Sequence, residues 1–288
     1  MHVLIATGGS AHSQIAVHLA AEMARTAAMR ITVLTVVKEL VEREKARWIL
    51  DQAVAILAPA QASVQSKVRV GLPVEEIARE AREGSYDLIF LGERSTHDFL
   101  VRLLGSTAHR VMQRVFCPLV VAKGKVRPIR RVLLCDSGAQ SPSLLHRFVV
   151  RLSELLEGEV DVIVLHVMSQ ISAAPGIPGK QLRARTDELI QVHAPEGDLL
   201  AQDVQVLART GIQAQPKVRH GLVVDEILAE ARHGDYDLIV IGANQSEGWQ
   251  RFLLDDLAHQ IVLKADRPVL VIKSRHGLHG RSPLRYNW

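Results

Sequence analysis

An internal repeat is the feature that most constrains how this chain can fold. Residues 68–92 align without gaps with residues 218–242, at an offset of 150 positions, and sixteen of the twenty-five aligned positions are identical. Unrelated segments of this length match at only about one or two positions, so the two stretches are copies of one structural unit. The register continues as far as Pro118 and Pro268. The sequence therefore predicts two similar domains in tandem.

The second copy is longer than the first. Val3–Gly9 resembles Val132–Gly138 at an offset near 129, so about twenty residues are added within the second copy. We expect them around Ser172–Gly179, where Pro and Gly mark a loop, and in the region before Lys217. The short basic stretch Lys123–Arg130 separates the copies. We therefore expect domains at 1–125 and 130–275, followed by a loosely ordered tail at 276–288. The alternative for the tail is a segment that docks on a partner through Trp288.

Five apolar or β-branched runs alternate with helical patterns in each copy. In the first copy the expected strands are Val3–Thr7, Ile31–Val37, Lys67–Val70, Asp87–Leu91 and Leu119–Ala122. The expected helices are His12–Ala28, Glu39–Leu57 (with Val41, Trp48, Val54 and Leu57 on one stripe), Val74–Glu83 and Ala108–Val115. This alternation predicts an α/β fold with two doubly wound parallel sheets. A chain that is 48% hydrophobic but only 4% aromatic suits such sheets, which Val, Ile and Leu fill.

The stretch from Gly92 to Thr107 follows a buried strand and leads into a helix. Glycine lets the backbone approach an anion closely, and the free N–H groups at a helix start point toward it. Ser106 and Thr107 would add hydroxyl donors. The stretch therefore suggests phosphate binding, with an ordinary strand-to-helix loop and a Ser/Thr cap as the alternative.

With these residues in view, residues 1–275 resemble a tandem universal stress protein. The nucleotide signature of that family is Gly-x2-Gly-x9-Gly-Ser/Thr, which corresponds here to Gly92, Ser95 in place of the second glycine, and Gly105-Ser106. The resemblance implies an adenine nucleotide α-hydrolase-like fold in which the last strands of the two copies meet across a pseudo-twofold axis. It also implies that ATP, ADP or AMP binds, with or without Mg²⁺. The residues implied for the base are Thr7, Gly8 and Val36, and those for phosphate and ribose are Gly92, Arg94, Ser95, Gly105, Ser106 and Thr107.

Two departures from the family pattern lie in the first copy and a larger one lies in the second. The first strand ends in Gly8-Gly9-Ser10 instead of Asp-Gly-Ser, and Ser95 replaces a glycine. In the second copy Asp255-Asp256 stands where the first has Gly105-Ser106. A carboxylate about 4 Å from a phosphate oxygen costs roughly 4 kcal/mol at an effective dielectric constant near 20, about a thousandfold in affinity. We therefore expect the second copy to bind no ATP and Asp255 to cap a helix.

Charge and hydropathy exclude several other classes. The net charge of +4 is too weak to indicate nucleic-acid binding. No apolar run reaches the roughly 18 residues that span a membrane, and the start shows no secretory signal. Two cysteines cannot form a disulfide framework. We expect a cytoplasmic protein.

Three functions remain open from the sequence. The leading hypothesis is a regulatory stress-response protein that binds an adenine nucleotide in its N-terminal domain and is not an enzyme. The alternatives are an interaction scaffold without nucleotide and a weak ATPase. His109 and His259 recur at equivalent positions, but the repeat alone explains this, and no nucleophile or carboxylate pair accompanies them. We expect a pseudo-dimer within the chain and a regulatory protein partner of unidentified kind, and leave a homodimer open.

Overall fold

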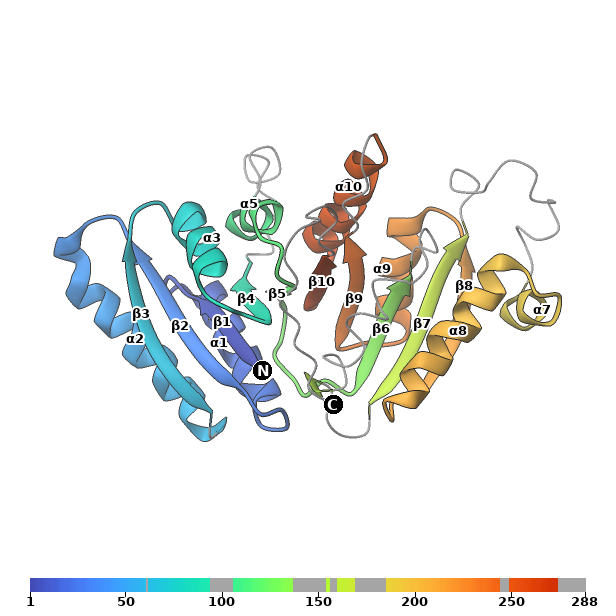
Figure 1. Ribbon diagram of the computed structural model, residues 1–288, viewed down its shortest axis with the longest axis horizontal. Helices are drawn as coiled ribbons and strands as arrows, with labels where there is room; N and C mark the ends of the chain where they lie inside the picture. The colour runs from blue at the N-terminus through green and yellow to red at the C-terminus, as the bar shows by residue number, and fades with distance from the viewer. Residues whose placement is uncertain are drawn as a thin grey trace, which may run out of the picture.

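The computed structural model describes residues 1–60, 62–93, 106–136, 154–155, 160–168, 185–243 and 249–273. Within these residues ten strands form one sheet in the order β3-β2-β1-β4-β5-β10-β9-β6-β7-β8 (Figure 1). The strands are β1 (His2–Ala6), β2 (Arg30–Val37), β3 (Ser63–Val70), β4 (Leu88–Gly92), β5 (Leu119–Ala122), β6 (Arg131–Asp136), β7 (Asp161–Met168), β8 (Ala214–His220), β9 (Leu238–Ala243) and β10 (Val269–Lys273). The predicted α/β fold is confirmed.

Helices cover both faces of this sheet. They are α1 (Ala11–Met23), α2 (Arg43–Leu57), α3 (Pro73–Glu83), α5 (Thr107–Arg114), α7 (Thr186–Gln191), α8 (Pro195–Arg209), α9 (Val223–His233) and α10 (Trp249–Lys264), with the 3-10 turns η1 (Leu40–Glu42) and η2 (Ala58–Ala60). One apolar core packs α1, α2 and α8 against the sheet, and the other packs α3, α5, α9 and α10 against the opposite face. Two-sided coverage explains why the central strands read as continuous apolar runs, whereas the edge strands β3 and β8 carry exposed polar residues.

The two halves join through their last strands. β5 and β10 pair antiparallel, with Val269 opposite Val121 and Val271 opposite Leu119, whereas the other neighbouring strands pair parallel. The last strands therefore meet as the family resemblance implied. Figure 1 shows the halves side by side, with β5 and β10 between them.

The repeated residues serve the fold. The Glu80 side chain is 1% exposed and accepts hydrogen bonds from Lys67, Arg69 and Tyr86 at 2.6–2.8 Å. The Glu230 side chain has the same three kinds of partner, namely Lys217, Arg219 and Tyr236. A buried carboxylate needs such partners. Three of the identical positions, those of Arg69, Glu80 and Tyr86, thus belong to one ion network that is built twice.

The expected apolar stripe on the second helix was wrong except at Leu57, which is buried. Val41 is 82% exposed, Trp48 is 58% exposed and Val54 is 36% exposed. The buried residues of α2 are Ala46, Ile49, Leu50, Ala53 and Leu57. Their spacing of three and four residues forms one helix face, and small side chains on it allow α2 to approach the sheet closely. Trp48 lies outside that set.

Helix boundaries and the extra segment differ in part from expectation. The first helix ends at Met23 rather than Ala28, and Ala27 and Met29, which follow it, are buried in the core. The second helix begins at Arg43 after the turn η1. The described part of the insertion contains α7, between β7 and α8, and Ser172–Gly179 lies outside the described residues, as does the tail 274–288.

Candidate functional site

The predicted base-binding residues lie together at the carboxyl ends of neighbouring strands. Ala6 is the last residue of β1 and pairs with Leu34 of β2 and Leu91 of β4. Thr7, the residue after β1, therefore lies beside Gly92, the last residue of β4. Connections leave β1 and β4 in opposite directions along the sheet, so this is the topological switch point where α/β folds place ligands.

A cluster of hydroxyl groups occupies the loop after β1. The Ser13 Oγ accepts from the hydroxyls of Thr7 and Ser10, at 3.1 and 3.2 Å, and from the Gly8 amide at 3.3 Å. It donates to the Ser10 carbonyl at 2.9 Å. Ser13 was missed by sequence reasoning, because the family motif does not include it. The signal available was a run of short polar residues before an Ala-rich helix.

Thr7 is held firmly at the centre of this loop. Its side chain is buried, and its carbonyl accepts a hydrogen bond from the Thr35 hydroxyl at 2.7 Å. Its hydroxyl also accepts from the Gly9 amide at 3.3 Å. Gly9 has φ +77°, a left-handed conformation that glycine adopts without strain. The loop after β1 is therefore a fixed turn with neutral hydrogen-bonding groups.

The two glycines of the predicted site differ in their surroundings. A Cβ at Gly92 would lie 2.0 Å from the His12 carbonyl oxygen and 2.7 Å from the Ser13 Cα, so close packing of β4 on α1 requires glycine there. Among the residues that the structure describes, no atom outside the neighbouring residues of the chain lies within 4 Å of a Cβ built at Gly8. The described residues therefore leave space beside Gly8, whereas Gly92 has a packing role whether or not it contacts a ligand.

Ser106 and Thr107 form the start of α5, the helix between β4 and β5. Ser106 has an extended backbone (φ −72°, ψ 165°), and its Oγ accepts from the His109 amide at 3.1 Å. The capping alternative for Ser106 is thus realised. A capping serine leaves other N–H groups of the first turn without intrahelical partners, so capping and anion binding are compatible.

The second half has no helix start at the equivalent position. α10 begins at Trp249, so the backbone of Asp255 and Asp256 lies inside the helix. The expectation that Asp255 caps a helix was wrong. Backbone N–H groups inside a helix bond to carbonyls one turn earlier and are not available to an anion. The asymmetry between the halves thus involves the backbone as well as the acidic side chains.

Three predicted residues, Arg94, Ser95 and Gly105, lie outside the described residues. Val36 is described and is partly buried near the end of β2.

The described residues contain no group of three His, Cys, Asp or Glu side chains that could hold a metal ion. Along the same residues, no helix combines the length and apolar character needed to cross a membrane.

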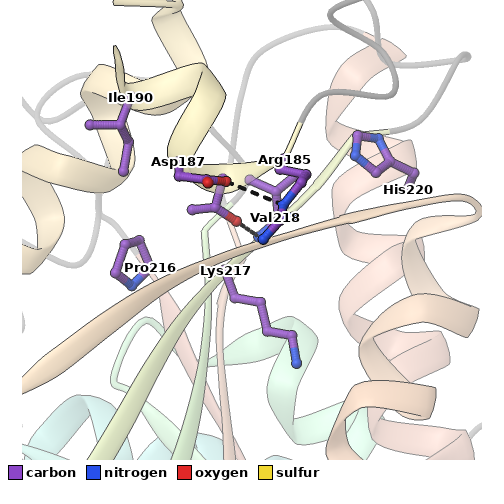
Figure 2. Close-up of a pocket in the computed structure, with 8 residues that line it drawn as sticks. Arg185, Asp187, Ile190, Pro216, Lys217, Val218 and His220 are labelled. Carbon is purple, nitrogen blue, oxygen red and sulfur yellow. Dashed lines mark hydrogen bonds and ion pairs between the residues drawn. The ribbon is translucent and has the colours of Figure 1, made fainter.

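A hollow of about 520 Å³ lies in the second half, between α7 and β8. Figure 2 shows Arg185 and Asp187 beside it, with their charged atoms 3.5 Å apart. The Lys217 side chain extends away from them and pairs with Glu230 at 2.8 Å. The charged groups of this hollow therefore serve each other or the ion network, and its walls depend on α7, which belongs to the insertion.

Comparison with known proteins identifies the fold. The profile of the Universal stress protein family matches residues 1–123 and 128–273. The crystal structure of a universal stress protein from Archaeoglobus fulgidus is similar over 94% of this chain and 96% of that chain, with 19% identity and a TM-score of 0.69. Universal stress protein MJ0531 from Methanocaldococcus jannaschii is 28% identical over 118 residues, 41% of this chain and 67% of that protein. A further structure, of the universal stress protein from Archaeoglobus fulgidus in complex with dAMP, is 23% identical and covers 50% of this chain and 98% of that one, with a TM-score of 0.33.

These matches define the class as an α/β protein with the adenine nucleotide α-hydrolase-like fold. Because the family profile matches both halves, the chain belongs to the universal stress protein family and carries two of its domains in tandem.

Proposed function

We propose that this protein is a regulatory universal stress protein that binds one adenine nucleotide (ATP, ADP or AMP) in its N-terminal half. The observation that carries the proposal is the difference between α5 and α10. α5 starts at Thr107 behind a capping serine, whereas α10 runs without a break through the equivalent position. At this aligned position, therefore, α5 offers a helix start to a phosphate group and α10 does not.

The surroundings of the first-half edge support the same proposal. The loop after β1, residues 7–10, presents hydroxyl and amide groups and no carboxylate, and the described residues leave space beside Gly8. Neutral donors at a sheet switch point suit a nucleotide better than acidic ones do. We propose Thr7, Gly8 and Val36 for the base, and Gly92, Arg94, Ser95, Gly105, Ser106 and Thr107 for phosphate and ribose, with any Mg²⁺ arriving on the nucleotide.

Equilibrium dialysis of the full chain with labelled ATP tests the proposal. We expect saturation at one nucleotide per chain. Two nucleotides per chain would show that the second half is also competent, and no saturation at millimolar ATP would reject the nucleotide. Phosphate release above a buffer blank, lost when Gly105 is replaced by Asp, would support an ATPase instead.

A scaffold function is the second candidate, and one observation favours it. Leu40 and Val41 follow β2 and are 59% and 82% exposed. Leu72 follows β3 and is 66% exposed. Since β2 and β3 pair in parallel, their carboxyl ends lie at one edge of the sheet. Exposed apolar residues at one edge are typical of a protein contact. The same dialysis separates this function, because a scaffold without nucleotide shows no saturation.

A further inference from the structure

Lys123 is a buried cation that reaches from the first half into the second. It directly follows β5, and its side chain is 1% exposed. Its Nζ donates to the carbonyl oxygen of Val262 and, at 3.3 Å, to that of Leu263. Both carbonyls belong to the last turn of α10, where backbone oxygens lack intrahelical partners and a positive charge is favourable. Lys123 therefore caps a helix of the other half.

The same ammonium group pairs with Glu93. The Glu93 Oε2 lies 3.7 Å from the Lys123 Nζ, and the Glu93 side chain is 5% exposed. Burial lowers the pKa of the Lys123 ammonium, and the charge of Glu93 opposes that change. Burying either charge alone would be costly, so each depends on the other.

Glu93 is also the residue that follows Gly92. The absent side chain of Gly92 would point at α1, and Glu93 points to Lys123. Successive residues of a strand alternate between the faces of the sheet, so one backbone step joins the candidate site to the buried ion pair. In the second half Ala243 stands at the position of Glu93 and pairs with Lys273, the repeat of Lys123, so this position of the second half carries no carboxylate.

The backbone beyond Lys123 fixes its position. Gly124 has φ +68°, and a Cβ there would lie 2.2 Å from the carbonyl oxygen of Asp266, just after α10. Glycine allows this close approach of the two halves. Lys123 is thus held against α10 by its own side chain and by the residue that follows it.

We propose that Lys123 is a positioning residue that, through Glu93, couples nucleotide binding at Gly92 to the last turn of α10. This inference rests on the proposed function. A nucleotide that shifts the end of β4 changes the Glu93–Lys123 contact, and thereby the capping of α10. Because coupling between sites is reciprocal, a change at α10 alters nucleotide affinity by the same factor.

Hydrogen exchange of the full chain, with and without saturating ATP, tests the coupling. The variant is Glu93→Gln/Lys123→Met, which keeps both side-chain volumes and removes both charges. The control is Lys125→Met, because Lys125 is exposed two residues further on. In the natural protein and the control we expect ATP to slow exchange in residues 257–265 at least about fivefold. In the double variant we expect ATP to bind without that slowing.

The outcomes are distinct. ATP binding to the natural protein without slower exchange in α10 overturns the coupling and leaves the proposed function in place. Equal slowing in the natural protein and the double variant also overturns it. No ATP binding to the natural protein overturns both proposals. If circular dichroism shows that the double variant does not fold, Glu93→Gln alone is measured by the same criterion.

Discussion

His109 of α5 and His259 of α10 stack on each other across the junction of the two halves. Their ring centroids lie 3.6 Å apart and their planes are inclined by 37°. The two residues occupy the same position in the two repeats, so the junction brings equivalent side chains into contact. Their recurrence therefore has a structural explanation that does not involve catalysis.

This stack predicts an energetic coupling between the two histidines. Aromatic pairs contribute about 0.5–1.5 kcal/mol beyond the area they bury. In a double-mutant cycle with His109→Ala and His259→Ala, we expect the free energies of unfolding in urea to be non-additive by at least about 0.5 kcal/mol. Additivity within about 0.3 kcal/mol would contradict a stabilising contact.

Glu80 is expected to be far more sensitive to neutralisation than its exposed neighbour. Glu80→Gln leaves Lys67 and Arg69 without their buried partner, and we expect a loss of about 3 kcal/mol in the free energy of unfolding. Glu83 also contacts Arg69 but is 56% exposed, so Glu83→Gln should cost less than about 1 kcal/mol. Similar losses for the two variants in urea unfolding would argue against the network.

The same network predicts acid sensitivity. Burial alone would raise the pKa of the Glu80 and Glu230 carboxyls, but hydrogen bonds from Lys67 and Lys217 and their neighbours outweigh it and hold each pKa below its ordinary value of 4.5. A carboxyl with a lowered folded-state pKa stabilises the fold above its unfolded pKa, and this contribution is lost as the pH falls through the folded value. In urea unfolding measured between pH 7 and pH 3, the free energy of unfolding should decrease once the pH is below the ordinary carboxyl pKa of 4.5. The Glu80→Gln/Glu230→Gln variant should show a shallower fall, and an unchanged pH profile would be inconsistent with this origin.

Gly92 and Gly8 form a matched pair. Gly92→Ala forces a Cβ against the His12 carbonyl, so we expect a loss of about 1–3 kcal/mol in stability. Gly8→Ala places its Cβ more than 4 Å from every described atom outside the neighbouring residues of the chain, and should change stability by no more than about 1 kcal/mol. Thermal unfolding of both variants checks the prediction, and equal losses would mean that β4 does not pack on α1 as described.

The buried face of α2 predicts stability losses of very different size at Leu50 and Trp48. Leu50 is 6% exposed, and Leu50→Ala should cost about 2–5 kcal/mol. Trp48 is 58% exposed, and Trp48→Ala should change stability by about 0.5 kcal/mol or less. A large loss at Trp48 in urea unfolding would restore the stripe expected from sequence.

The sequence predicted the central strands well because strands buried on both faces are continuous apolar runs, as Leu88–Leu91 shows. It predicted only the second half of the edge strand β3 (Ser63–Val70), because the exposed polar residues of that strand form no such run. It predicted the packing of α2 poorly, because Trp48 and Val41 look like core residues until the small face around Ala46 and Ala53 is seen against the sheet. The Glu93–Lys123 pair could not be predicted from sequence, since it depends on how the ends of β4 and β5 lie beside each other. The capping of α10 by Lys123 could not be predicted either, since the two carbonyls lie about 140 residues away. The hydroxyl network around Ser13 likewise depends on a fold of the loop that the residue types alone do not specify.

Nucleotide affinity at the start of α5 tests the central claim most directly. Asp and Asn cap helices as well as Ser does, so Ser106→Asp and Ser106→Asn should both fold like the natural protein. Only Ser106→Asp places a carboxylate where the phosphate is proposed to lie, copying Asp256. In titrations with a fluorescent ATP analogue, we expect Ser106→Asn to bind within about threefold of the natural protein and Ser106→Asp to bind between about tenfold and a thousandfold more weakly. Equal affinity for the two variants would contradict a nucleotide phosphate at this helix start.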